Sequence, residues 1–397
     1  MSEPNPFRPG AGRVPPVLAG RDAIMSVVDT VMRDVVGSGE GDRPIVISGL
    51  RGVGKTVLLN EFVRRARESR RWVAIKLEAV NGRSLASQLA QALHTEMRKQ
   101  MSLGDIAVVK LRRAASALRS FQLRVDPTGT YSFGFDVEPL AGVADSGQLE
   151  VDLRELLEEL AAALRELDTA LLLAIDELQE APAADLNALN VALHDIGQDA
   201  HPAPILFIGT GLPSLPAVLA DATSYAERLY DYRALDLLTD SETRVALSAP
   251  TGDRGVSWDV AALDEAVASV SGYPYFAQAC GKHVWDSRAV VDRISVEDAR
   301  IGIELARDEV DRGLYQSRWE RATPAQREMM KAMALDAGRP SSIQDLVART
   351  GKKRTSDLSV SRRELIRNGH VYAPDRGYLS FTVPGMSDYI ERRGFDV

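Results

Sequence analysis

Short apolar runs alternate with longer amphipathic stretches through residues 17–240 of the chain. The apolar runs predict strands at 45–48, 72–77, 170–175 and 204–208. The stretches between them carry apolar residues at helical spacing and predict helices at 55–68, 84–100, 149–167 and 184–196. Strands that alternate with helices favour a parallel sheet covered by helices on both faces. We therefore predict an α/β fold with a parallel sheet for this part of the chain.

Two segments do not follow this alternation. Residues 1–16 are rich in Pro and Gly, so we expect an extended arm with little structure of its own. Residues 101–147 form an insertion between the second and third strands. Within it, residues 121–125 and 130–137 alternate apolar and polar side chains around Asp126–Gly129, which predicts a β-hairpin with its turn.

The pattern of residues 241–317 is helical, without strands. Helices are expected near 241–249, 259–271, 274–288 and 295–313. Gly272-Tyr273-Pro274 falls at a break between two of them, where Pro274 can begin the next helix. We interpret this region as a helical lid over the sheet.

Residues 318–397 predict three helices followed by a hairpin. The helices are expected over Thr323–Leu335, Ser342–Thr350 and Ser356–Asn368, and the hairpin over Val371–Phe381. A helix-turn-helix followed by a tight two-stranded wing is the order of elements in a winged helix. We expect this domain to be separate, with a small core of its own.

The segment Gly49–Thr56 reads Gly-Leu-Arg-Gly-Val-Gly-Lys-Thr and fits the phosphate-loop pattern G-x-x-x-x-G-K-[ST]. Its glycines permit a tight backbone that turns N–H groups toward phosphates, Lys55 can reach the β- and γ-phosphates, and the Thr56 hydroxyl can bind Mg²⁺. A glycine turn between any strand and any helix is the alternative, and the order of strand, loop, lysine and helix argues against it. The predicted nucleotide contacts in this segment are Gly49, Leu50, Arg51, Gly52, Val53, Gly54, Lys55, Thr56 and Val57.

A second chemical signal follows the third predicted strand, where Thr169–Ile175 runs directly into Asp176 and Glu177. Carboxylates at the C-terminal end of a buried parallel strand lie at the rim where ligands bind. We predict that Asp176 holds Mg²⁺ and that Glu177 polarises the attacking water. Taken alone, such a pair is more often a helix cap or a solvated strand end; together with the phosphate loop, the metal and base roles are favoured.

Composition bounds the class of protein. The chain has 397 residues, 45% of them hydrophobic and 26% charged, which suits two or three globular domains. A single cysteine, Cys280, excludes an intrachain disulfide framework and a four-cysteine zinc site, and favours a reducing compartment. The first residues lack the pattern of a signal peptide, and no stretch reaches the length of a membrane span. We therefore expect a cytoplasmic protein without membrane contact.

Charge is unevenly distributed over a chain whose net charge is −8. Residues 318–397 contain fifteen Lys and Arg and ten Asp and Glu, a net charge of +5, which leaves −13 for the remainder. A basic module on an acidic body is the pattern expected when only one domain meets a polyanion, and a solvated basic face without a partner is the alternative. The candidate DNA contacts are Lys352, Lys353, Arg354, Ser361, Arg362, Arg363, Arg367 and Arg376, of which Ser361 and Arg362 are the expected base readers. The alternative is a winged helix used for protein docking or dimerisation.

These elements together resemble the AAA+ ATPases of the origin-recognition-complex-like and STAND (signal-transduction ATPase) type. The resemblance covers nearly the whole chain outside the insertion. The motifs that carry it are Leu18–Asp22 before the first helix, Gly49–Thr56 as Walker A, Leu171–Glu177 as Walker B, Phe207–Gly211 as a sensor strand and Gly272–Pro274 in the lid. The resemblance implies ATP as the nucleotide, with ADP as its product.

The same resemblance implies roles for single residues. Thr210 would sense the γ-phosphate or position the water, and Gly20, Arg21 and Pro274 would lie near adenine. Arg228 occupies a place where such families often carry an arginine finger, and an ordinary helix-surface arginine is the alternative. The lid has no clear second sensor arginine, and the long repeat arrays of many STAND proteins are absent, which argues against strong ATP-driven oligomerisation.

The sequence thus predicts a nucleotide-controlled switch that hydrolyses ATP with Mg²⁺ and engages DNA through its winged helix. ATP between the sheet and the lid would set the angle between them, and so the exposure of the winged helix. The competing hypothesis is a slow or non-catalytic ATP-dependent regulator whose winged helix docks a protein partner or a second copy. DNA retention that falls steeply with salt separates the first hypothesis from the second.

Overall fold

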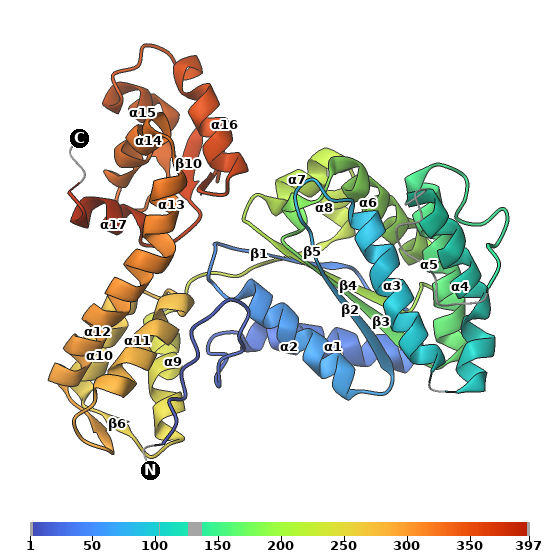
Figure 1. Ribbon diagram of the computed structural model, residues 1–397, viewed down its shortest axis with the longest axis horizontal. Coiled ribbons are helices and arrows are strands. Elements are labelled where there is room, and N and C mark those ends of the chain that lie inside the picture. The colour runs from blue at the N-terminus through green and yellow to red at the C-terminus, as the bar shows by residue number, and fades with distance from the viewer. Residues whose placement is uncertain (1–2, 103, 126–136, 395–397) are drawn as a thin grey trace.

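The computed structural model describes residues 3–102, 104–125 and 137–394, and its N-terminal half is built on one parallel sheet (Figure 1). The sheet has the strand order β2-β3-β4-β1-β5. Its strands are β1 (Ile45–Ser48), β2 (Trp72–Glu78), β3 (Ala170–Asp176), β4 (Ile205–Gly211) and β5 (Asp231–Ala234). The four predicted strands and the α/β class are confirmed. β5 was not predicted because it is a short edge strand with polar, partly exposed residues.

Alternate residues of the strands enter two separate cores. Ile45 and Ile47 of β1 pack with helices α1 (Asp22–Ser38) and α2 (Lys55–Glu68). Val46 faces the opposite core, which is built mainly by α3 (Leu85–Met101), α5 (Leu149–Glu166), α6 (Ala183–Gln198) and α7 (Leu215–Ala222). The predicted helices of this half are confirmed, and the sheet is covered on both faces. None of the helices in the described ranges is long and apolar enough to cross a membrane.

The insertion is helical where a strand was expected. Residues 121–125 are the last turn of α4 (Asp105–Val125), so the predicted first strand of the hairpin is wrong. Leu111, Leu118 and Phe121 recur at helical spacing and are buried in the same core as α3 and α5. Burial of this face outweighs the local alternation. The predicted turn and nearly all of the second strand lie outside the described residues.

The lid consists of four main helices, as predicted. They are α9 (Asp240–Gly252), α10 (Val260–Val270), α11 (Pro274–Ser287) and α12 (Val296–Val310). Two-residue strands β6 (Ser257–Trp258) and β7 (Arg293–Ile294) pair between them, so the expectation of a region without strands is wrong in this detail. Capping boxes at Thr239 and Ser295 start α9 and α12.

The C-terminal region has the order of elements predicted from its sequence. Helices α14 (Pro324–Ala334), α15 (Ile343–Arg349) and α16 (Ser359–Arg367) precede strands β9 (Val371–Tyr372) and β10 (Tyr378–Phe381). A short strand β8 (Ser341–Ser342) and a terminal helix α17 (Met386–Arg392) complete it. The three strands pair in the antiparallel order β8-β10-β9.

The C-terminal region does not have a core of its own. One continuous apolar cluster includes residues of the lid and of the C-terminal helices, with Tyr315 and Trp319 between them. The helix α12 continues through a π-helical turn at Asp311–Tyr315 into α13 (Gln316–Arg321), so the predicted boundary after residue 317 falls inside a helix. The expectation of a separate core is wrong because this shared helix buries side chains toward both regions. Lid and C-terminal region therefore form one packed body.

The N-terminal arm is extended, as expected, but it is packed rather than free. Phe7 is 4% exposed and lies against Gly281 of α11, where an added Cβ would be 2.3 Å from its ring. Asn5 donates a hydrogen bond of 2.9 Å to the carbonyl of Lys282 in the same helix. The arm then crosses to α2, where Asn60 Nδ2 donates to the carbonyl of Gly12 at 2.7 Å. It thus joins the lid to the helix that follows the phosphate loop.

Candidate nucleotide-binding site

The phosphate loop lies between the end of β1 and the start of α2, at the carboxyl edge of the sheet. The amide of Gly49 donates a hydrogen bond of 3.1 Å to the carbonyl of Gly211 at the end of β4, which anchors the loop to the sheet. A Cβ on Gly49 would lie 2.3 Å from the carbonyl oxygen of Leu235, and one on Gly52 would lie 2.2 Å from Tyr273 Oη. Gly52 also has a φ of +79°, in the left-handed region. Only glycine fits these two positions.

Lys55 is buried in its own loop. Its side chain is 5% exposed, and Nζ donates to the carbonyls of Gly49 at 2.8 Å and Leu50 at 2.7 Å. Burial lowers the pKa of Lys55 to about 8, against the opposing effect of Glu177 and Asp176. The amine is therefore charged at neutral pH and lies close to both carboxylates. An anion entering the loop would replace two carbonyl acceptors with phosphate oxygens.

Asp176 and Thr210 meet on neighbouring strands. Asp176 ends β3 and is 3% exposed, and Thr210 on β4 is fully buried. The Thr210 hydroxyl donates a hydrogen bond to Asp176 Oδ1, which also accepts from the amide of Glu177 at 3.0 Å. These bonds fix the orientation of the carboxylate. They also engage the Thr210 hydroxyl with Asp176.

The donor set fits Mg²⁺. Magnesium binds to proteins through one or two oxygen side chains and completes its octahedral shell with waters and substrate phosphates. Thr56 at the start of α2 and Asp176 at the end of β3 offer one hydroxyl and one oriented carboxylate. The described residues contain no cluster of three or more His, Cys, Asp or Glu that would hold a metal by itself. This composition suits an ion that arrives together with a nucleotide.

Glu177 is held in an unusual backbone conformation. Its φ is +49°, in the left-handed region, and it precedes the single turn η1 (Leu178–Glu180) without capping it through its side chain. The carboxylate is engaged on both oxygens: Gln179 Nε2 donates to Oε2 at 2.5 Å, and Arg51 Nη1 lies 3.7 Å from Oε1. A side-chain cap, the alternative considered for this carboxylate, is therefore excluded. The strained backbone aims the carboxylate at the loop.

The residues expected near adenine gather at the phosphate loop. Arg21 is 7% exposed, and its Nη2 donates to the carbonyls of Val53 at 2.9 Å and Asp236 at 3.1 Å. Burial lowers the pKa of Arg21, and Glu242 and Asp236 oppose this effect. Arg21 thus stabilises the loop through its hydrogen bond to the carbonyl of Val53. Pro274 is the first residue of α11 and follows Tyr273, whose hydroxyl lies against the loop. Contact of these residues with adenine stays a prediction.

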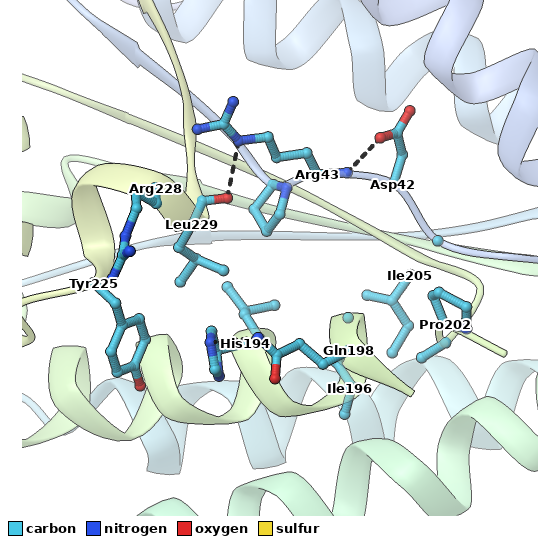
Figure 2. A pocket seen from close by; sticks show the side chains of 15 residues that line it. Asp42, Arg43, His194, Ile196, Gln198, Pro202, Ile205, Tyr225, Arg228 and Leu229 are labelled. Carbon is cyan, nitrogen blue, oxygen red and sulfur yellow. Dashed lines mark hydrogen bonds between the residues drawn. The ribbon is translucent and has the colours of Figure 1, made fainter. Parts of the chain in front are cut away.

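Arg228 lies at the other end of the sheet. It belongs to α8 (Ala226–Leu229) and lines a cavity of about 610 Å³ at the amino ends of β1 and β4 (Figure 2). Figure 2 shows the Tyr225 and His194 rings facing each other beside it, with 4.4 Å between ring centroids. The phosphate loop is at the carboxyl ends of the same strands. Arg228 is therefore separated from the Lys55 site of its own chain.

The candidate DNA contacts lie on the surface of the C-terminal region. Ser361 and Arg362 of α16 are half-buried, and the remaining candidates are exposed: Lys352, Lys353, Arg354, Arg363, Arg367 and Arg376. Two of the cations are already paired with acidic neighbours, Arg367 with Glu364 at 3.2 Å and Lys352 with Glu328 at 3.5 Å. The candidates thus lie on α16, before it and in the β9–β10 turn, and most of them are accessible.

A contact that the sequence did not predict joins the loop to the C-terminal region. The amide of Arg51 donates to the carbonyl of Thr382 at 2.8 Å. Arg318 of α13 donates to the carbonyl of Gly369, beside Arg51, at 3.1 Å. The acceptors are backbone carbonyls, which carry no side-chain signal in a sequence. Gln179, which binds Glu177, was also missed, although its position two residues after the Walker B pair is a usable signal.

Comparisons with known proteins agree with this arrangement. Residues 17–208 match the family described as an AAA ATPase domain, and residues 312–390 match a family described as a domain of unknown function. The search of curated proteins found no match.

Solved structures with a similar fold span nearly the whole chain. The Aeropyrum pernix ORC2 protein in its ADPNP–ADP complexes has a TM-score of 0.57 and 13% identity, and the match covers 96% of each chain. A Walker-type ATPase of Pyrococcus abyssi has a TM-score of 0.56 and 18% identity, covering 91% of this chain and 95% of that one. At such identities the likeness concerns the fold.

The burial of Lys55 predicts a pH-dependent affinity for ATP. The amine attracts phosphate only when protonated, and its pKa of about 8 means that it loses its charge as pH rises through this value. We expect the affinity for Mg·ATP to fall by about tenfold between about pH 7 and about pH 9, measured by calorimetric titration at constant ionic strength.

The matched control is Lys55→Ala, which should bind ATP far more weakly and without this fall, because no amine remains to titrate. A wild-type affinity that is constant over the same range, or a fall of equal size in Lys55→Ala, would contradict the assignment of Lys55 to the phosphates.

Proposed function

We propose that this chain, which carries an AAA ATPase domain at residues 17–208 within an AAA+ P-loop fold, is an ATP-hydrolysing switch whose C-terminal region binds duplex DNA as a winged helix. The observation that carries the proposal is the hydrogen bond from Arg51 of the phosphate loop to Thr382. It joins the nucleotide site directly to the basic region. A change of phosphate occupancy in the loop therefore acts on the C-terminal region without an intermediate element.

Hydrolysis is proposed to use the groups already held at the loop. Thr56 and Asp176 would hold Mg²⁺, which when bound would supply positive charge at the β- and γ-phosphate oxygens. Lys55 stabilises the charge on the transferred phosphoryl group. Glu177 orients a water and accepts its proton as the water oxygen attacks the γ-phosphorus, and the bond to the bridging oxygen breaks to release ADP.

Thr210 is proposed to act by fixing Asp176. Its hydroxyl donates to Oδ1 of this carboxylate and comes from the strand next to β3. A carboxylate whose orientation is fixed by a neutral donor keeps its charge for the metal. This assigns Thr210 a positioning role within the sensor function implied by the resemblance.

The lid is proposed to close on the same nucleotide. Tyr273 at the start of α11 lies against Gly52, and Pro274 follows it toward the expected adenine position. Gly20 and Arg21 approach from the chain before α1, and Arg21 binds the loop carbonyl of Val53. ATP would thus contact both bodies, which supports a nucleotide-dependent angle between them.

DNA binding is supported by the cations around α16. A winged helix presents its third helix to the major groove and its wing to the backbone, and the exposed cations follow this arrangement on α16 and at Arg376 in the β9–β10 turn. Figure 1 shows α16 on the side of the C-terminal region that faces the ATPase core. Movement of this region away from the core would open access to that face.

A protein partner is the second candidate. The ion pairs of Arg367 with Glu364 and of Lys352 with Glu328 reduce the charge available to a polyanion, which favours docking of a protein on the same face. A slow or non-catalytic regulator of this kind would retain its partner at high salt, whereas DNA would be released. Self-association belongs to this class, with Arg228 as the residue offered to a neighbouring copy. We also propose a cytoplasmic location, because the single cysteine, Cys280, is buried and free.

The first test separates ATP binding from hydrolysis. Glu177→Gln retains the shape of the side chain and the Mg²⁺ partner Asp176 but removes the proton acceptor, so turnover should fall by about 10²-fold with ATP binding retained. Glu180→Gln, in the same turn, is the matched control and should leave turnover unchanged. Equal steady-state hydrolysis by Glu177→Gln and the wild type would refute the role of Glu177.

The second test concerns DNA. Replacing Arg362 and Arg363 with Ala should weaken binding of the full-length protein to duplex DNA by roughly 2–5 kcal/mol, because a base contact and a phosphate contact are lost. ATP affinity should be unchanged. Fluorescence anisotropy at several salt concentrations gives both the affinity and its salt dependence.

The control for this pair is the double replacement of Arg67 and Arg70, two exposed arginines of the ATPase core, which removes the same charge elsewhere. Equal weakening by both double variants would reduce the DNA contact to a general charge effect. No binding by the wild type at low salt would assign the C-terminal region to protein docking.

A further inference from the structure

Arg51 of the phosphate loop contacts the backbone of the C-terminal region at Gly369 and Thr382, and we call this the Arg51 contact. Its amide donates to the carbonyl of Thr382, and the Thr382 hydroxyl in turn donates to the carbonyl of Gly369 at 2.6 Å. Arg318 donates to the same Gly369 carbonyl at 3.1 Å. Gly369 has a φ of +65°, and a Cβ there would lie 2.8 Å from Arg51 Nη2. The backbone at Gly369 therefore packs closely against the arginine side chain.

The same side chain reaches the proposed catalytic carboxylate. Arg51 Nη1 lies 3.7 Å from Glu177 Oε1, while Gln179 Nε2 occupies Oε2 at 2.5 Å. The cation and the amide restrain the carboxylate and compete with a water for its oxygens. In the docked arrangement Glu177 is thus hindered as a base.

Several positive charges lie near the Arg51 contact, on Arg51, Arg318 and Arg321. Burial, with repulsion from Arg51 in addition, lowers the pKa of Arg318 to about 10. Burial, with Arg318, Arg321 and Arg51 in addition, lowers the pKa of His370 to about 4. Among the described residues, Arg51 Nε and His370 Nδ1 are buried without a hydrogen-bond partner. Unpaired polar atoms and like charges make this contact weaker than its close fit suggests, so it can open.

We propose that Arg51 is a positioning residue that transmits docking of the C-terminal region to Glu177. Docking holds the guanidinium on the carboxylate and suppresses hydrolysis, and undocking releases Arg51 and frees Glu177 for water. The inference rests on the proposed ATPase function and adds its regulation. It assigns inhibition to the closed arrangement, and it predicts that whatever draws the C-terminal region away from the core raises turnover.

The test is steady-state ATP hydrolysis by full-length variants without DNA. Arg51→Ala removes the cation from Glu177. Arg318→Ala removes the hydrogen bond to the carbonyl of Gly369 and so weakens the Arg51 contact. Each should raise kcat by about tenfold, because the ion pair between Arg51 and Glu177 is lost or loosened. Because both act on one contact, the double variant should not exceed the larger single effect. Arg312→Ala, an exposed residue of the same continuous helix, is the control and should match the wild type.

A second measurement ties the gain to the carboxylate. In the Glu177→Gln background, Arg51→Ala should no longer raise the residual turnover, whereas an effect of Arg51 that does not act through Glu177 would raise turnover in both backgrounds. If the wild type hydrolyses ATP and Glu177→Gln does not, but Arg51→Ala is equal to or slower than the wild type, the inference fails and the proposed function stands. If neither the wild type nor Arg51→Ala hydrolyses bound ATP, both fail.

Discussion

The backbone of the phosphate loop leaves no room for side chains where other segments approach it, and this close packing organises the molecule. The chain after β5 lies against Gly49, the lid tyrosine Tyr273 lies against Gly52, and Arg21 supports the loop through the carbonyl of Val53. The C-terminal region reaches the same loop through Thr382. Four separate parts of the chain therefore depend on the conformation of one short turn. A ligand that reshapes this turn acts on all of them.

Much of the fold followed from local patterns. Strands β1 to β4 and the main helices were predicted because buried parallel strands are continuously apolar and surface helices are amphipathic. The exceptions are decided by tertiary contacts. The last turn of α4 is helical because Phe121 is buried against α3 and α5, and β5 forms on the edge of a sheet that already exists. The shared core of lid and C-terminal region depends on Tyr315 and Trp319, whose burial no local pattern reveals.

The meeting of the candidate site residues at one edge of the sheet was predictable for a similar reason. Lys55, Thr56, Asp176 and Glu177 follow strands at fixed spacing, and parallel strands bring their carboxyl ends together. The sequence did not reveal the partners of these side chains. Lys55 donates hydrogen bonds to carbonyls of its own loop, and Glu177 is engaged by Arg51 and Gln179. The AAA+ resemblance correctly indicated the fold. The hydrogen bond between Arg51 and Thr382 joins two backbone groups, which explains why no sequence motif predicts it.

The central claim is that nucleotide occupancy of the phosphate loop controls docking of the C-terminal region. Amide hydrogen exchange of the full-length protein, followed at residues 49–56 and 369–382 with and without a non-hydrolysable ATP analogue, measures this most directly. The account predicts that the analogue protects the loop and alters exchange at 369–382, and that Lys55→Ala shows neither change. Protection of the loop with unaltered exchange at 369–382 would contradict it.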